Sequence, residues 1–140
     1  MIYLDSSALM KLVREEAETE ALRDWLASKP EIPVVTSELG RVEVLRAARR
    51  AGSDALTEAH AVIGDVDLIP LDRGVQDIAC EIADPPLRTL DALHLASAVL
   101  LGDDLTVLAA YDRRLLAAAQ VAGLPTITPQ SAKNRPEPDS

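Results

Sequence analysis

The chain has 140 residues, a length that fits one domain with its own hydrophobic core. It contains one cysteine, Cys80, which excludes an internal disulfide and a zinc site built on thiolates. The formal net charge of −9 argues against the broad basic surface with which many proteins capture nucleic acids.

The chain begins MIYLDSSALMKL, without a basic leader before an apolar run, and no apolar run reaches the length of a membrane span. We therefore expect neither a signal peptide nor a transmembrane helix. The expected location is the cytoplasm, with no membrane partner.

Short aliphatic segments along the chain predict five β-strands. These are Ile2–Leu4, Pro33–Thr36, Asp67–Leu71, Thr106–Ala109 and Thr126–Ile127. Helical patterns lie between them, one opening at Ser6 and Ser7 and the others at Ala17–Ser28, Leu39–Ala51, Thr57–Val66, Arg73–Ala83, Leu90–Leu101 and Asp112–Ala122. The alternation predicts an α/β fold with a central, mostly parallel sheet.

Local signals mark several boundaries of these elements. Asp72 is a candidate N-cap for the helix that follows it, and Gly123 with Pro125 predicts the end of the last helix. Residues 130–140 are mostly polar and contain two prolines, so we expect a disordered tail behind a single domain spanning residues 1–129.

Two acids directly follow predicted strands. Asp5 comes after Ile2–Leu4, and Asp112 comes shortly after Thr106–Ala109. Ligands of parallel sheets bind beyond the carboxyl ends of the strands, which makes both acids candidates for a functional site. Each acid alone is also explained as the N-cap of the next helix.

Two further acids lie inside predicted helices. Glu43 is close to the apolar stripe of its helix, and three roles are open for it. It can face a shared pocket, reach solvent, or pair with Arg46 three residues on. Asp91 lies in a helix so apolar that it should be buried nearly all round, and a buried carboxylate needs either a cation or a capping role. His94, one turn later, is expected to be a structural residue.

The joint placement of Asp5, Glu43, Asp91 and Asp112 decides between these alternatives. Four carboxylates at one end of a sheet would repel one another unless a cation neutralised them. Hard divalent cations prefer oxygen ligands, and two of them can clamp a phosphodiester during hydrolysis. The sequence therefore predicts a Mg²⁺-dependent phosphodiesterase site in which metal-activated water attacks phosphorus, with Asp5 and Asp91 as the principal ligands.

Four segments in this order resemble the PIN-domain family, and more narrowly its VapC-type toxin ribonucleases. They are IYLDSSALMKL at the N-terminus, SELGRVEVLRA from Ser37 to Ala47, LDALHLASA from Leu90 to Ala98, and YDRRLLAAA from Tyr111 to Ala119. The resemblance spans nearly all of the chain up to about Pro129.

The resemblance implies a three-layer α/β/α sandwich and Mg²⁺- or Mn²⁺-dependent cleavage of RNA that leaves 5′-phosphate and 3′-hydroxyl ends. It implies a homodimer, a tightly bound antitoxin protein in a heterotetramer or larger assembly, and contact with DNA only through that antitoxin. The metal-binding acids carry over as Asp5, Glu43, Asp91 and Asp112, with Ser6 as a hydroxyl near the metal. Ala110 stands where the family often has threonine, so a hydroxyl contact is lost there. The metal-binding role of Asp112 is therefore the least secure of the four assignments.

Two other functions fit the sequence less well. Phosphoaspartyl transfer through Asp5 lacks a second acid two residues on, where Ser7 stands, and no lysine follows a suitable strand. A non-catalytic interaction module remains the alternative function, although all four acids are present. The acidic pocket also predicts an antitoxin that inhibits by inserting an arginine or lysine among the carboxylates.

Overall fold

The central sheet has five strands, all parallel, in the spatial order β3-β2-β1-β4-β5. The structure is a computed structural model that describes residues 1–82 and 86–132. The strands are β1 (Ile2–Leu4), β2 (Val34–Ser37), β3 (Asp67–Ile69), β4 (Val107–Ala109) and β5 (Thr126–Ile127). The predicted parallel sheet is confirmed, with strand ends shifted by one or two residues.

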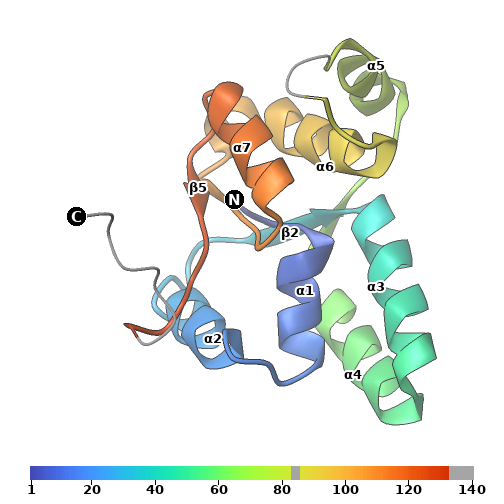
Figure 1. Cartoon of the computed structure of the whole chain (residues 1–140), viewed down its shortest axis with the longest axis vertical. Coiled ribbons are helices and arrows are strands. Elements are labelled where there is room, and N and C mark those ends of the chain that lie inside the picture. Colours follow the sequence, from blue (N-terminus) through green and yellow to red (C-terminus); the bar gives the residue numbers. More distant parts are fainter. Residues whose placement is uncertain (83–85, 133–140) are drawn as a thin grey trace.

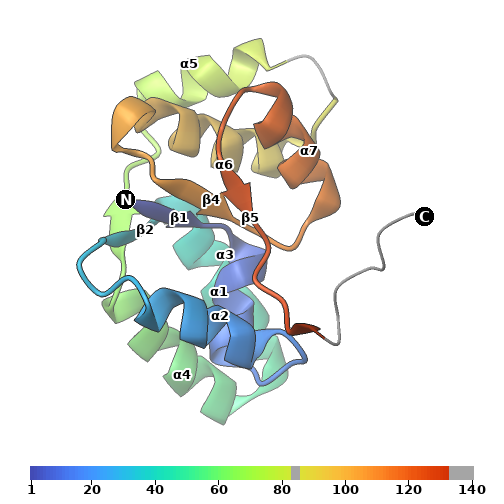
Figure 2. The same ribbon diagram turned by 90° about the vertical axis from the view of Figure 1, so that its left-hand side faces the viewer.

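Helices cover both faces of this sheet and make three layers (Figures 1 and 2). One face carries α1 (Ser6–Val13), α2 (Thr19–Ala27), α3 (Glu38–Ala51) and α4 (Ser53–Gly64), and the other carries α5 (Arg73–Glu81), α6 (Thr89–Leu100) and α7 (Arg113–Val121). The predicted α/β/α sandwich is therefore confirmed.

The alternation of side chains along β1 divides the core into two halves. Ile2 and Leu4 are fully buried against α1 to α4, whereas Tyr3, fully buried as well, points into the half formed with α6 and α7. In the register of the sheet Leu4 lies beside Ala109. The carboxyl ends of β1 and β4 therefore meet at one edge, and the chain leaves both strands toward the same site.

The predicted helices are present, but several begin or end at other residues than predicted. The helix expected at Thr57–Val66 begins at Ser53 behind Gly52, whose φ of 125° suits glycine, and it ends at Gly64. Asp72 caps α5 as predicted, because its Oδ1 accepts a hydrogen bond from the Val75 N–H. Ala83 and most of the tail predicted over residues 130–140 lie outside the described residues, so the domain boundary stays a prediction.

Over residues 1–82 and 86–132, no helix is both long enough and apolar enough to cross a membrane.

Candidate active site

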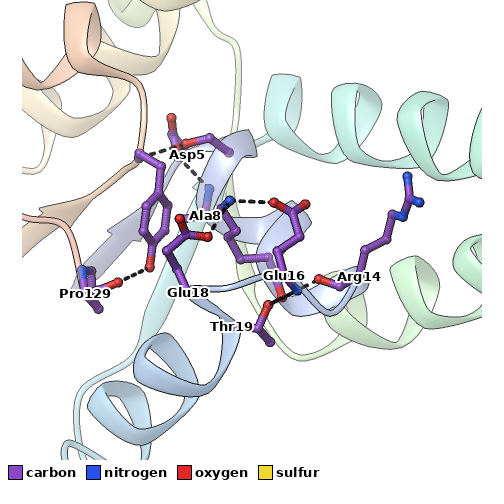
Figure 3. Close-up of polar contacts among 10 residues, drawn as sticks. Asp5, Ala8, Arg14, Glu16, Glu18, Thr19 and Pro129 are labelled. Carbon is purple, nitrogen blue, oxygen red and sulfur yellow. Dashed lines mark hydrogen bonds and ion pairs between the residues drawn. The ribbon is translucent and has the colours of Figure 1, made fainter. Parts of the chain in front are cut away.

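Asp5 ends β1 and begins α1. Its Oδ1 accepts hydrogen bonds from the Ala8 N–H at 2.9 Å and from the Ser7 hydroxyl at 2.6 Å, and the residue is only 4% exposed (Figure 3). The capping role considered for Asp5 is thus real. It occupies one carboxylate oxygen, and Oδ2 accepts no hydrogen bond from any described residue.

Asp112 repeats this arrangement after β4. Its Oδ1 caps α7 by accepting from the N–H groups of Arg114 and Leu115, at 2.9 and 3.1 Å. The Asp5 N–H donates to the Ala109 carbonyl across the adjoining strands, which places both acids at the same sheet edge. Capping leaves Oδ2 of Asp112 without a hydrogen-bond donor among the described residues.

Glu43 reaches this edge from α3. Its Oε1 accepts hydrogen bonds from the Ser6 hydroxyl at 2.5 Å and from His94 Nε2 at 2.6 Å. Of the three alternatives considered for Glu43, the shared pocket is correct. The ion pair with Arg46 does not form, and Oε2 accepts no hydrogen bond within the described part of the chain.

His94 joins Glu43 to the buried side of the sheet. The imidazole is 2% exposed, and its Nδ1 lies 2.7 Å from the hydroxyl of Tyr3. A carboxylate can only accept hydrogen bonds, so Nε2 carries the proton shared with Glu43. The raised pKa of Tyr3, caused by burial and by the charge of Asp5, keeps its hydroxyl protonated as a donor to Nδ1.

Asp91 lies in the first turn of α6, where one expectation is wrong and one of its two alternative roles is excluded. The residue is partly exposed rather than buried all round, because Thr89 and Leu90 beside it face solvent. It does not cap the helix either, since the N-cap position is Arg88 and no side chain accepts a hydrogen bond there. Without a cap, the carboxylate of Asp91 is held by no hydrogen bond to the described residues.

Mutual repulsion within this cluster appears in the pKa values. Burial first, and the charge of Asp112 next, raise the pKa of Asp91, with Glu43 adding to the effect. Burial also raises the pKa of Asp5, where hydrogen bonds from Ser7 and Ala8 oppose it and Asp112 adds to it. For Glu43, burial is outweighed by the hydrogen bonds from His94 and Ser6, so its pKa is lowered.

The lysine nearest to Asp5 along α1 does not neutralise the acids. Lys11 Nζ forms ion pairs with Glu16 at 2.6 Å and Glu18 at 2.9 Å, the two acids labelled in Figure 3. It also lies 5.2 Å from the centre of the Tyr111 ring. Tyr111 in turn donates its hydroxyl hydrogen to the Pro129 carbonyl and its N–H to Ser7. Among the described residues, no lysine or arginine pairs with any of the four clustered acids.

Gly40 allows α3 to approach the sheet closely enough for Glu43 to reach the site. A Cβ at this position would lie 2.5 Å from the Thr36 hydroxyl oxygen and 3.5 Å from the His94 ring. Thr36 cannot move freely, because its hydroxyl donates to the carbonyl of Leu4. A glycine here is therefore a packing requirement of the site.

The structure brings together all five predicted site residues and adds three that the sequence analysis did not assign. Ser6 is present as expected, bonded to Glu43, but Ser7 is the hydroxyl that contacts Asp5. His94 and Tyr3 complete the buried chain of hydrogen bonds. The spacing of Asp91 and His94 by three residues on one helix was the available signal for His94.

The donor set fits a hard divalent cation. As the side chains lie, no three His, Cys, Asp or Glu side chains of the described residues are close enough to hold one ion. Each clustered carboxylate nevertheless keeps at least one oxygen free of hydrogen bonds from the described residues, and oxygen donors are what Mg²⁺ and Mn²⁺ prefer.

Comparison with known proteins agrees with this geometry. The profile of the PIN-domain family matches residues 2–128. The chain belongs to the PIN-domain family. A Mycobacterium tuberculosis relative, named Ribonuclease VapC35, is 40% identical over 135 residues, which cover 95% of this chain and 100% of the relative. The predicted membership among VapC-type PIN domains is confirmed.

Solved structures share this PIN-domain fold. The crystal structure of Mycobacterium tuberculosis VapC20, described as a sarcin–ricin loop cleaving toxin, has a TM-score of 0.71 at 23% identity and covers 92% of this chain and 100% of that one. A chain of a toxin–antitoxin complex from Klebsiella pneumoniae has a TM-score of 0.72 at 17% identity, covering 94% and 99%. At such identities the likeness establishes the α/β/α architecture.

Proposed function

We propose that this PIN-domain protein is a metal-dependent endoribonuclease and the toxin of a toxin–antitoxin pair. The observation that carries the proposal is the convergence of Asp5, Glu43, Asp91 and Asp112 on one sheet edge, where no lysine or arginine of the described residues forms an ion pair with them. Relatives named ribonucleases support the reaction, and a neighbour described as a toxin–antitoxin complex supports the biological setting.

Asp5 and Asp91 are the proposed principal ligands of Mg²⁺, for which Mn²⁺ can substitute. Burial, with a smaller contribution from the charge of Asp112, raises the pKa of both acids, and a bound cation would offset that cost of ionisation. For Glu43 and Asp112 the proposed role is to orient water or to hold a second ion. When bound, such a cation stabilises charge on phosphoryl oxygens and lowers the pKa of water.

The protein's own part in the reaction is orientation. His94 and Ser6 fix one oxygen of Glu43, which leaves the other free to accept a hydrogen bond from a water molecule beside the phosphodiester. The caps at Asp5 and Asp112 fix one oxygen of each in the same way. No side-chain nucleophile is required, and 5′-phosphate and 3′-hydroxyl ends are the expected products.

Cleavage of a panel of structured RNAs tests this assignment. The wild-type protein should cut RNA with Mg²⁺ or Mn²⁺ and not with EDTA, and Asp5→Asn should lose at least about 10²-fold in rate, since metal charge stabilisation supplies several kcal/mol. Equal activity of the two proteins contradicts the assignment. Absence of both cleavage and Mn²⁺ binding by calorimetry would favour the non-catalytic module.

The proposed protein partner is an antitoxin that covers the acid cluster. An arginine or lysine of the antitoxin would replace the missing cation among the carboxylates, and contact with DNA would come only through the antitoxin. Within this proposal the toxin is a cytoplasmic homodimer and forms a heterotetramer or larger complex. Co-purification with a small basic-tailed protein, weakened by Asp5→Asn with Asp91→Asn, is the expected result. Equal retention of that protein by the double variant would contradict this inhibition.

A further inference from the structure

A hollow of about 580 Å³ opens beside the acid cluster, between α1 and α3. Ser6 and Glu43, which belong to the cluster, form part of its wall, so the hollow and the site are continuous. Arg46 and Arg50 line it from α3, and the exposed side chains of Val42 and Leu90 border it. Figure 1 shows α1 and α3 running side by side below the sheet edge.

The two arginines extend the face of α3 that carries Glu43. Positions 43, 46 and 50 follow the i, i+3, i+7 spacing of one helix face. Arg46 and Arg50 lie roughly 6 Å apart along the helix axis, a step comparable to the spacing of consecutive phosphates in a nucleic acid strand. In the described part of the chain, neither guanidinium forms an ion pair or a side-chain hydrogen bond.

This charge distinguishes the hollow from another on the same side of the sheet. The hollow of about 350 Å³ between α1, α2 and α4 has Arg23 on its wall together with the acids Glu58 and Asp65. In the α1–α3 hollow, the single acid is Glu43, whose Oε1 is already bound by Ser6 and His94. The α1–α3 hollow is therefore cationic in a chain of net charge −9.

We propose that Arg46 and Arg50 bind RNA backbone phosphates adjacent to the one that is cleaved. The inference rests on the proposed ribonuclease function and assigns part of its substrate site. Arginine suits this role because its planar guanidinium donates two parallel hydrogen bonds to a phosphate. A local pair of cations next to the acids also explains how a strongly acidic protein holds a polyanion without a broad basic surface.

RNA binding by variants of the Asp5→Asn protein tests the proposal without cleavage of the ligand. The probe is a fluorescently labelled, mixed-sequence RNA oligonucleotide, titrated at several salt concentrations in the presence of Mg²⁺. Arg46→Gln and Arg50→Gln should each weaken binding about threefold to tenfold and reduce the slope of log K against log salt by about 0.7. In the active protein the same substitutions should raise KM and leave kcat nearly unchanged.

Arg49→Gln is the matched control. Arg49 shares the last turn of α3 with Arg50, so both changes remove the same charge near the helix end, but Arg49 does not line the hollow. Its variant should keep the Kd and salt slope of the parent. Equal behaviour of all three variants, with RNA still bound and cleaved, would overturn this inference and leave the ribonuclease assignment standing.

Two other outcomes also count against the proposal. If the Asp5→Asn protein does not bind RNA and the wild-type protein does not cleave it, the ribonuclease assignment and this inference fail together. If Arg46→Gln and Arg50→Gln instead change the oligomeric state in size-exclusion chromatography and leave the salt slope intact, the hollow is an interface with a second copy of the chain.

Discussion

His94 Nε2 lies 2.6 Å from Glu43 Oε1, although 51 residues separate the two along the chain. Through this contact the buried hydroxyl of Tyr3 is connected, by way of the imidazole, to a carboxylate at the sheet edge. His94 is thus a positioning residue, because it fixes Glu43 and has almost no exposed surface with which to touch RNA.

His94→Ala should lower kcat strongly and leave KM for RNA nearly unchanged. The substitution removes a hydrogen bond from Glu43 and leaves the Tyr3 hydroxyl without its partner, which costs about 1–3 kcal/mol of stability. His94→Gln, whose amide can both donate and accept, should recover part of kcat. A folded His94→Ala protein with normal kcat, checked by its melting temperature, would contradict the positioning role.

Asp5→Asn should raise the melting temperature in EDTA at pH 8. The pKa of Asp5 is higher in the folded protein than in the unfolded chain. Protonated Asp5 therefore favours the folded state, and this contribution to the free energy of unfolding is fully present below the pKa of the unfolded chain. It is lost as the pH rises through the pKa of the folded protein. Asparagine stays neutral and still accepts the Ala8 N–H as an N-cap. The increase in melting temperature should become smaller as the pH falls through the pKa of Asp5 in the folded protein. An increase that does not depend on pH would contradict the electrostatic explanation.

Asp112→Asn and Asp112→Ala separate capping from charge at the start of α7. Asparagine keeps the hydrogen bonds from Arg114 and Leu115, whereas alanine loses them at a cost of about 1 kcal/mol. If Asp112 serves the proposed metal site, both variants should lose activity and only Asp112→Ala should melt earlier. An active Asp112→Asn protein would restrict Asp112 to capping.

Gly40→Ala should destabilise the protein by about 1–3 kcal/mol, since the new Cβ meets Thr36 in a packed core. The displaced α3 would also move Glu43, so activity should fall further than stability alone explains. Gly64→Ala is the control: apart from its chain neighbours and the adjoining backbone of α4, no atom of the described residues lies within 4 Å of the new Cβ, and alanine favours a helix. Denaturant unfolding of both variants measures the difference, and equal stabilities would show that α3 has room to adjust.

Arg114→Gln should weaken RNA binding more than Arg113→Gln. Arg114 lines a third hollow together with Arg88, whose charge partly offsets the raised pKa of the neighbouring Asp91. None of the described residues that line this hollow is acidic. Arg113 does not line it. We expect a loss of about threefold for Arg114→Gln in the anisotropy assay, from one phosphate contact. Equal effects of the two substitutions on RNA binding would show that this hollow does not contact the RNA.

The sequence by itself determined the strands, the helices and the N-cap at Asp72, and it offered capping as one of two roles for Asp5 and Asp112. These features depend on partners within about three residues, so local pattern is sufficient to predict them. It also indicated the four acids, because two of them follow strands and parallel strands deliver their carboxyl ends to one edge.

The tertiary structure alone decided which side chains hold these acids in place. Glu43 pairs with His94 rather than with Arg46, and Ser7 rather than Ser6 contacts Asp5. The distance from α3 to the sheet depends on Gly40 meeting Thr36 in β2, a contact between helix and sheet that no sequence period encodes. Contacts of this kind form only when separate elements pack, since burial selects which distant polar groups must satisfy one another.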